Sequence, residues 1–267
     1  MKIGLCQFSV TGDKSQNIER AVQAIGEAAG QGAQIIVLPE MFNCPYDNQY
    51  FRAYGETEDG PTLGHLQALV KDLGIVLVAG SIPELEGDKV YNTAYVIDRD
   101  GRLVGKHRKA HLFDIDIPGG ISFTESKTLT AGERATVVET SLGKIGVAIC
   151  YDMRFPEIFR DMVLGGADLI CIPAAFNMTT GPAHWHLTAR ARALDNQAYM
   201  ALCSPARVEE AGYVAYGHSL VANPWGEVVG ECGHEDQVLV VDLDWTLLKK
   251  TREGLPLLKH RRPEIYG

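Results

Sequence analysis

The chain lacks the features of a disulfide-bonded, secreted or membrane-spanning protein. No apolar run approaches the roughly 20 residues that a transmembrane helix needs, and the first ten residues, MKIGLCQFSV, lack the pattern of a signal peptide. There is no Cys-x-x-Cys pair, which argues against a disulfide framework and against a zinc site. We therefore expect a cytoplasmic protein with no membrane partner. The six cysteines lie scattered at positions 6, 44, 150, 171, 203 and 232.

The chain also lacks an excess of positive charge. It has 25 Lys and Arg against 34 Asp and Glu, a formal net charge of −9, which argues against a broad nucleic-acid surface. The two basic clusters, KHRK at 106–109 and KHRR at 259–262, are typical of solvated faces. We expect no nucleic-acid partner. No tandem repeat, low-complexity tract or linker interrupts the chain, so we predict a single domain over 1–267.

Apolar runs typical of buried strands alternate with amphipathic helical segments, and this alternation predicts an α/β fold. The predicted strands are 1–10, 33–38, 75–79, 90–97, 103–107, 136–139, 144–149, 168–173, 199–204, 218–221, 227–231 and 238–242, with a hairpin between 90–97 and 103–107. The predicted helices are 15–30, 62–73, 156–164 and 185–196, and the tail 245–267 has moderate helical content. Residues 108–134 are predicted to be an irregular loop, and a loop this long usually has a function.

Cys150 lies where the apolar run 145–149 ends and a helix-like segment begins, within GVAICYDMRFPEIFR. A thiol at such a junction is delivered into a cleft, and the backbone N–H groups after it are free to bind an oxyanion. The alternative is a core cysteine that acts as a small hydrophobic residue. Taken alone, Cys150 favours that alternative.

Two further residues also follow apolar strands. Glu40 follows the run 33–38. Partial desolvation at this position would raise its proton affinity and suit it to general-base catalysis. The alternative for Glu40 is an exposed cap of the next segment. Lys109 follows 103–107 and could stabilise negative charge or position the thiol, although a loop lysine alone is more often a solvated charge.

The three residues together favour catalysis, because strand ends in an α/β protein converge on one rim. A cysteine nucleophile needs a group that takes its proton, and a nearby cation makes its thiolate easier to form. A papain-like site would need a histidine, for which His184 and His186 are candidates. No papain signature surrounds Cys150.

The chain resembles the nitrilase superfamily of carbon–nitrogen hydrolases over essentially its whole length. The matching segments are VLPEMF around Glu40, HRKAHLFD around Lys109 and GVAICYDMRFPE around Cys150. Within this superfamily it is most similar to the omega-amidases, on the segments 114–132, 176–199 and 204–228. One departure is His186, where an acidic residue is expected in the animal enzymes.

The resemblance implies a four-layer α-β-β-α sandwich with no metal and no organic cofactor. It implies that Glu40 takes the proton of the Cys150 nucleophile, while the Lys109 ammonium and the N–H of Tyr151 hold the oxyanion. Glu125 matches a second family glutamate with a supporting role, although a surface position is its alternative. A homodimer or higher homo-oligomer is also implied, with helices near Cys150 facing the partner.

The resemblance further implies a small-molecule amide substrate with an α-keto acid carboxylate at its far end. Arg154 is the candidate partner of that carboxylate, and an internal salt bridge with Asp152 or Glu157 is its alternative. We expect Arg192 and Asp195 to pair structurally. Weaker pocket candidates are Tyr46, Phe176, Met178 and Thr179.

Three hypotheses about function remain open at this point. The first is an omega-amidase that hydrolyses 2-oxoglutaramate or 2-oxosuccinamate to the dicarboxylate and ammonia. The second is a related amidase that acts on deaminated glutathione or on N-carbamoyl amino acids. The third is a binding or scaffold protein in which the three residues are vestigial, and the intact Glu40, Lys109 and Cys150 argue against it.

Overall fold

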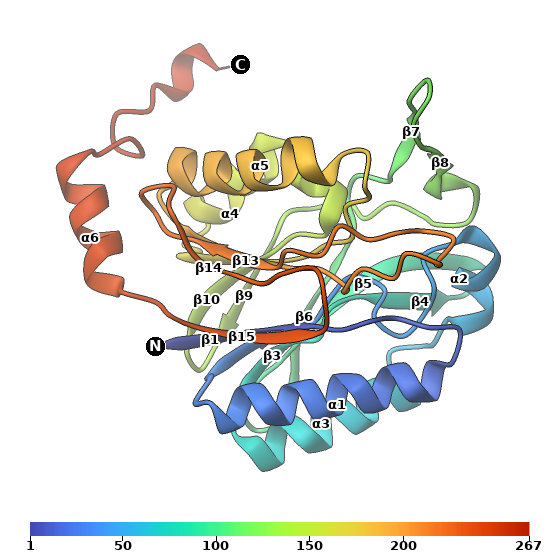
Figure 1. The fold of residues 1–267 in the computed structure, drawn as a ribbon. Coiled ribbons are helices and arrows are strands. Elements are labelled where there is room, and N and C mark those ends of the chain that lie inside the picture. Colours follow the sequence, from blue (N-terminus) through green and yellow to red (C-terminus); the bar gives the residue numbers. More distant parts are fainter. Residues whose placement is uncertain (267) are drawn as a thin grey trace.

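Two β-sheets stacked face to face form the centre of the protein in a computed structural model, which describes residues 1–266 (Figure 1). The first sheet has the order β15-β1-β2-β3-β5-β4, with β6 also paired to β5. Its strands are β1 (Lys2–Gln7), β2 (Ile35–Val37), β3 (Val76–Val78), β4 (Ile82–Glu86), β5 (Lys89–Ile97), β6 (Leu103–Arg108) and β15 (Gln237–Asp242).

The second sheet has the order β14-β13-β12-β11-β10-β9. Its strands are β9 (Thr136–Thr140), β10 (Gly143–Val147), β11 (Leu169–Pro173), β12 (Tyr199–Cys203), β13 (Leu220–Ala222) and β14 (Val228–Glu231). A separate small hairpin joins β7 (Asp114–Asp116) and β8 (Ser122–Thr124). In each large sheet three neighbouring strands run parallel, β1-β2-β3 and β10-β11-β12.

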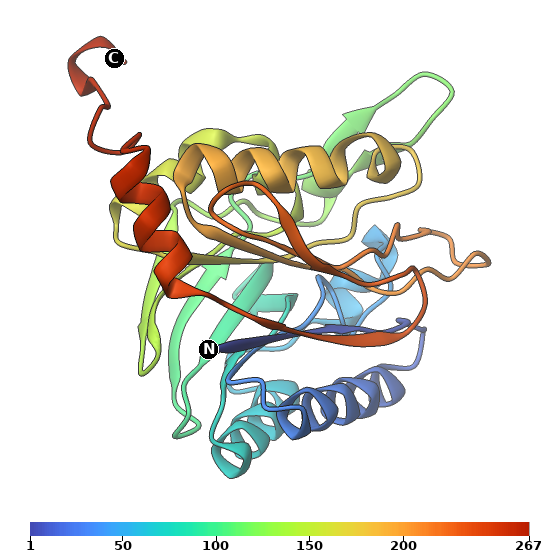
Figure 2. The same ribbon diagram turned by 60° about the vertical axis from the view of Figure 1, so that its left-hand side comes forward.

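Helices cover the outer face of each sheet, so the layers run α-β-β-α (Figures 1 and 2). Helices α1 and α3 lie on the first sheet, and α4 and α5 lie on the second. The α-helices are α1 (Lys14–Gly30), α2 (Asn48–Tyr54), α3 (Pro61–Leu73), α4 (Pro156–Leu164), α5 (Gly181–Asn196) and α6 (Trp245–Gly254). Three short 3-10 turns are η1 (Glu125–Lys127), η2 (Cys150–Arg154) and η3 (Pro263–Ile265). The predicted four-layer α/β sandwich is confirmed.

Alternating side chains bury both faces of the first sheet, as β2 illustrates. Ile35 and Val37 face the second sheet and join a core that includes Val147 and Ile172, whereas Ile36 faces the helices with Ile25. Because both faces of such a sheet are buried, its strands appear in the sequence as continuous apolar runs. The shared core between the two sheets supports the prediction of one domain.

Most predicted elements are present within a few residues, and the helix 156–164 has the predicted bounds. The prediction that 108–134 is wholly irregular is wrong, because this segment contains the β7–β8 hairpin and η1. Strand β4 and helix α2 were not predicted, since each is short and carries several polar residues. Helix α5 begins at Gly181, earlier than predicted, with Pro182 in its first turn. Within residues 1–266 no helix is long and apolar enough to cross a bilayer.

An ion-pair network around the buried Glu84 carboxylate fixes the end of β6, directly before Lys109. The Glu84 carboxylate on β4 accepts two hydrogen bonds from the Arg108 guanidinium, each 2.8 Å long, and one of 2.6 Å from Lys106. Burial raises the pKa of Glu84, and the hydrogen bonds from Arg108 and Lys106 outweigh it, lowering the pKa to about 2. The folded state therefore holds Glu84 ionised.

Glu84→Gln is expected to lower the free energy of unfolding at pH 7 by about 1 to 3 kcal/mol, less than the full pKa shift implies, because solvent around Arg108 and Lys106 screens the network. Because the folded pKa is depressed, the wild-type advantage is fully present above pH 4.5 and is lost as pH falls toward 2. Urea unfolding at pH 7 and pH 3 measures both effects. The matched control is Glu86→Gln, whose exposed carboxylate pairs with the same Arg108. Equal losses of unfolding free energy in the two variants would contradict the assignment of this stabilisation to Glu84.

Candidate active site

Three strand ends bring Glu40, Lys109 and Cys150 together between the two sheets. Glu40 follows β2, Lys109 follows β6, and Cys150 follows β10 and opens η2. All three side chains are buried, with exposed fractions of 1%, 0% and 4%. The first two come from one sheet and the third from the other, so the stacking of the sheets creates the cluster.

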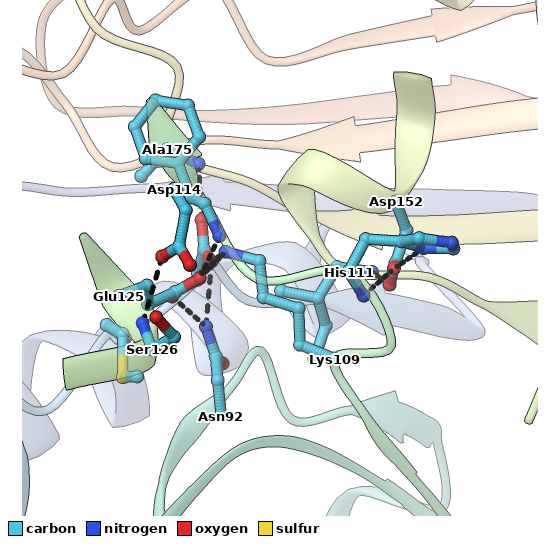
Figure 3. Close-up of polar contacts among 12 residues, drawn as sticks. Asn92, Lys109, His111, Asp114, Glu125, Ser126, Asp152 and Ala175 are labelled. Atoms are coloured by element: carbon cyan, nitrogen blue, oxygen red, sulfur yellow. Dashed lines mark hydrogen bonds and ion pairs between the residues drawn. The ribbon is translucent and has the colours of Figure 1, made fainter. Parts of the chain in front are cut away.

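The Lys109 ammonium lies at the centre of this cluster (Figure 3). Its Nζ donates to Glu40 Oε1 at 2.9 Å, to Glu125 Oε1 at 3.0 Å and to the Tyr46 hydroxyl at 3.0 Å. An ammonium has three protons to donate, so this arrangement satisfies all of them. Lys109 is therefore held in one position by the groups around it.

Glu125 is fully buried, so its alternative position at the surface is wrong. Its Oε2 accepts the N–H of Phe113 at 2.6 Å, and its Oε1 accepts the Tyr46 hydroxyl at 2.9 Å. It opens η1, directly after the β7–β8 hairpin that the sequence did not predict. The long segment between β6 and β9 thus returns to the site and delivers a second carboxylate to Lys109.

Glu40 lies between Lys109 and the thiol, so its alternative role as an exposed cap is wrong. Its Oε2 accepts the N–H of Ala175 at 2.9 Å, and its Oε1 accepts Asn92 Nδ2 at 2.8 Å. Burial and the negative charge of Glu125 raise the pKa of Glu40, while Lys109 and a hydrogen bond with the Cys150 thiol lower it; the net direction is upward. A carboxylate with raised proton affinity in contact with a thiol is suited to general-base catalysis.

Cys150 is buried in a strained backbone conformation. Its φ of 43° lies in the left-handed region, which is uncommon for residues other than glycine and is found at functional sites. Burial and the negative charge of Glu40 raise the pKa of the Cys150 thiol well above 9.0, although Lys109 acts in the opposite direction. The attraction of Lys109 lowers the pKa of this thiol, as predicted for a nearby cation. Burial outweighs the attraction of Lys109.

Lys109 itself stays protonated. Burial lowers the pKa of its ammonium, but the charges of Glu125 and Glu40 outweigh burial and raise the pKa well above 10.5. The buried cluster therefore contains one fixed cation between two carboxyl groups, beside a neutral thiol.

A cavity of about 400 Å³ reaches Glu40 from the surface. Tyr46, Ala175 and Tyr213 line it near Glu40, and the segment 205–212 lines it farther out. The Tyr213 hydroxyl donates to the Ala175 carbonyl oxygen at 2.6 Å, and its ring lies 4.6 Å from the ring of Tyr46. Aromatic rings thus form the wall of the cavity beside the carboxylate.

Arg154 lies at the end of η2, outside the lining of this cavity. Its Nη1 is 3.1 Å from His184 Nδ1, and its guanidinium lies 4.9 Å from the ring centre of Phe176 and 5.7 Å from that of Tyr151. Within residues 1–266 the alternative salt bridges to Asp152 and Glu157 do not form, because Asp152 is occupied by two histidines. Arg154 therefore keeps its charge available beside two aromatic rings.

The remaining candidates differ in position. Phe176 is buried, whereas Met178 and Thr179 after it are exposed. The expected pair of Arg192 and Asp195 is present at 3.9 Å. Among residues 1–266 no cluster of three or more His, Cys, Asp or Glu side chains is arranged to hold a metal ion.

Asn92 and Tyr213 were not predicted as site residues. Asn92 is a fully buried amide in the middle of β5, and a polar residue within an otherwise apolar strand was a usable signal. Tyr213 lies in a segment without regular secondary structure, and no pattern in the sequence marks its approach to Tyr46.

The comparisons with known proteins agree with this geometry. The family model for carbon-nitrogen hydrolases matches residues 2–253. An omega-amidase of Xenopus tropicalis is 50% identical over 100% of this chain and 96% of its own length. The human omega-amidase is 46% identical with the same coverage, and the chloroplastic omega-amidase of Arabidopsis thaliana is 52% identical over 99% of this chain and 73% of its own length.

Two solved structures share the fold. The crystal structure of Saccharomyces cerevisiae Nit3, a member of branch 10 of the nitrilase superfamily, has a TM-score of 0.91 and 42% identity, covering 98% of this chain and 96% of that one. An amidase variant from Nesterenkonia sp. AN1, which carries acrylamide added at its active-site cysteine, has a TM-score of 0.78 and 28% identity, covering 96% of this chain and 98% of that one. On these findings the chain belongs to the carbon-nitrogen hydrolase family.

Proposed function

We propose that the protein is an omega-amidase, which hydrolyses the terminal amide of 2-oxoglutaramate or 2-oxosuccinamate to the dicarboxylate and ammonia. The observation that carries the proposal is the buried cluster of Glu40, Lys109 and Glu125 beside Cys150. The omega-amidases that are 46% to 52% identical over nearly the whole chain support the choice of substrate.

In the first step Glu40 takes the proton of Cys150 as the sulfur attacks the amide carbonyl. Because the pKa of the resting thiol is raised, the proton leaves only when substrate is bound and the base is in contact. The tetrahedral oxyanion takes the place of the newly protonated Glu40 as the third acceptor of the Lys109 ammonium, and it also accepts the N–H of Tyr151 in the first turn of η2, an interaction worth about 3 to 4 kcal/mol per donor.

In the second step Glu40 returns the proton to the leaving nitrogen. The C–N bond breaks, ammonia departs, and a thioester remains on Cys150. Glu40 then takes a proton from water, whose oxygen attacks the thioester. As the C–S bond breaks and the carboxylic acid leaves, Glu40 gives that proton to the sulfur, which restores the thiol and the carboxylate. Glu125 and Tyr46 hold Lys109 in place during both steps, because both are hydrogen-bonded to it.

Arg154 provides the charge for the α-keto acid carboxylate at the far end of the substrate. It is half-buried, lies on the same turn as Cys150 and contacts the ring of Phe176. A guanidinium beside aromatic rings is only partly hydrated, and it can bind a carboxylate with two hydrogen bonds. Phe176 and Tyr151 lie beside Arg154 and would contact that end of the substrate, and the exposed Met178 and Thr179 follow Phe176 in the chain.

The protein is further proposed to be a homodimer that works in the cytoplasm, with residues 1–267 acting as one domain. Helices α4 and α5 lie side by side on the outer face of the second sheet (Figure 1). Exposed apolar side chains lie on these helices and on the turn between β13 and β14. These side chains are Leu164, Leu187, Leu194 and Trp225, with exposed fractions of 51%, 69%, 41% and 52%. We place the dimer contact on this face, because exposed apolar side chains are typical of protein–protein interfaces. All six cysteines are unpaired, which suits a reducing compartment.

Cys150→Ala is expected to reduce ammonia release from 2-oxoglutaramate by at least about 10⁴-fold, because no other group can form the thioester. A coupled assay for ammonia measures the rate. Cys232→Ala is the matched control, since it removes a buried thiol elsewhere in the fold. A Cys150→Ala variant with wild-type activity would remove the nucleophile assignment, and a wild-type protein inactive on both keto-amides but active on other amides would remove the substrate assignment.

Arg154→Met is expected to lower kcat/KM for 2-oxoglutaramate by about 10²-fold, mainly through KM, because the substrate loses a charge-assisted partner. The rate with an uncharged amide of the same chain length should change by less than about threefold. Arg99→Met, at the distant turn between β5 and β6, is the control. Equal losses with charged and uncharged amides would contradict the role of Arg154.

Leu187→Glu is expected to shift the protein from dimer to monomer, because a charge at the centre of an apolar interface is costly to bury. Light scattering at several protein concentrations measures the mass in solution. Leu73→Glu changes an exposed leucine on α3, on the opposite side of the molecule, and serves as the control. A monomeric wild-type protein would contradict the proposed dimer.

A further inference from the structure

Asp152 is a buried carboxylate that the proposed chemistry does not use. It lies two residues after Cys150 in η2 and is fully buried. Its Oδ1 accepts the backbone N–H of His111 at 3.0 Å and His111 Nδ1 at 2.8 Å. Its Oδ2 accepts the backbone N–H of Ile149 at 2.9 Å and contacts His107 Nε2 at 2.9 Å. Both oxygens therefore have two donors.

These donors come from the two segments that carry the reacting groups. His107 and His111 lie two residues before and two residues after Lys109, and Ile149 lies directly before Cys150. The first pair belongs to β6 of the first sheet and its continuation, whereas Ile149 leads from β10 of the second sheet into η2. Figure 3 shows His111 and Asp152 in contact beside Lys109. One carboxylate thus joins the lysine segment to the cysteine turn.

The two histidines are themselves held in place. His107 Nδ1 lies 2.9 Å from the hydroxyl of Thr136 on β9, so the His107 ring also contacts the second sheet. The ring of His111 is stacked on Phe155, with centres 3.7 Å apart and an angle of 9° between the planes. Neither histidine can turn away without losing a second contact.

Asp152 also closes the strained turn at Cys150. Its carboxylate accepts the Ile149 N–H, and its own backbone N–H donates to the Ile149 carbonyl oxygen at 3.0 Å. The residue enclosed by these contacts is Cys150 with its positive φ of 43°. A left-handed residue other than glycine persists only when its surroundings determine its conformation. Asp152 provides that constraint on both sides of the turn.

Asp152 keeps its charge throughout the neutral range. Burial raises the pKa of this carboxyl, but hydrogen bonds from His107 and His111 outweigh burial and hold it well below its usual value. The hydrogen bonds that a charged carboxylate accepts from its four donors are stronger and geometrically more specific than those to a neutral acceptor.

We infer that Asp152 is a positioning residue, which aligns the Cys150 sulfur and the Tyr151 N–H with the Lys109 ammonium by fastening both segments to one carboxylate. This inference rests on the proposed function, because it assigns Asp152 to the geometry of that reaction. Its effect should be on the rate of the chemical step and not on substrate binding, since Asp152 lies behind the reacting groups and is not exposed.

Asp152→Asn tests this inference, because it preserves the shape but replaces one oxygen by a donor. The Ile149 N–H and the His111 N–H point at different oxygens, so one backbone N–H loses its acceptor whichever way the amide is oriented. Misplacement of about 1 Å can reduce a rate about 10²-fold. We expect kcat to fall about 10²-fold while KM changes by less than about threefold.

Asp98→Asn is the matched control, because it replaces another buried carboxylate that accepts hydrogen bonds from two backbone segments. Asp98 also accepts backbone N–H groups on both oxygens, from Arg99 at 2.8 Å and Ser141 at 3.0 Å. It lies six residues beyond Asn92 on the β5 side, roughly 20 Å away along the strand. We expect its kcat to stay within about twofold of wild type, even if its melting temperature falls as much as that of Asp152→Asn. Equal losses of kcat in the two variants would overturn the inference.

His111→Phe provides a second variant if Asp152→Asn does not fold. It keeps a ring that can stack on Phe155 and removes only the donor to Asp152. We expect kcat to fall about 5- to 10-fold with KM unchanged, in proportion to one lost hydrogen bond. A His111→Phe variant with wild-type kcat would overturn the inference.

A measurement that needs no amide substrate separates this inference from the proposed function. The rate of alkylation of Cys150 by iodoacetamide is followed by mass spectrometry on the tryptic peptide 145–154, which contains one cysteine. We expect Asp152→Asn to slow alkylation at least about tenfold relative to Asp98→Asn, because the sulfur is displaced from Glu40. Equal rates would overturn the inference, whereas a wild-type protein that alkylates but releases no ammonia from any keto-amide would refute only the proposed function.

Discussion

The contact of the Lys109 ammonium with two buried carboxyl groups is the interaction on which the rest of the site depends. An unpaired ammonium in this position would cost several kcal/mol, and so would either carboxylate alone. The three groups therefore require one another, and Tyr46, Asn92 and backbone N–H groups satisfy their remaining hydrogen bonds. The strand ends that carry the groups must meet within hydrogen-bonding distance, which constrains the stacking of the two sheets.

The same cluster raises the pKa of the Cys150 thiol. The site has one cation and two carboxyl groups, so a thiolate at Cys150 would add negative charge to a buried region that already contains it. In the proposed mechanism the proton leaves the sulfur only as Glu40 takes it during attack. This differs from sites in which a neighbouring cation creates a resting thiolate. The chemistry depends on contact with a base of raised proton affinity.

The sequence predicts the strands and helices well where apolar periodicity is long, as in α1, α4 and the β5–β6 hairpin. It also indicates Glu40, Lys109 and Cys150, because each follows an apolar strand. It does not reveal β4, α2 or the β7–β8 hairpin, which are short and stabilised by tertiary contacts. Nor does it reveal Tyr213 or the contact of Asp152 with His107, because these depend on how segments far apart in sequence pack. Asn92 is marked only by its polar side chain within β5. The direction of the Cys150 pKa shift could not be predicted from the sequence, because it depends on the burial of the thiol in the folded protein.

The central claim is that Cys150 forms a thioester with the acyl group of a keto-amide. Single-turnover reactions with 2-oxoglutaramate, quenched in acid at a series of times and digested with trypsin, test it most directly. The account predicts that the peptide 145–154 transiently gains the mass of 2-oxoglutaric acid less one water, and that hydroxylamine removes the adduct. Dicarboxylate that forms while this peptide keeps its unmodified mass at every time, or an adduct on another cysteine, would contradict it.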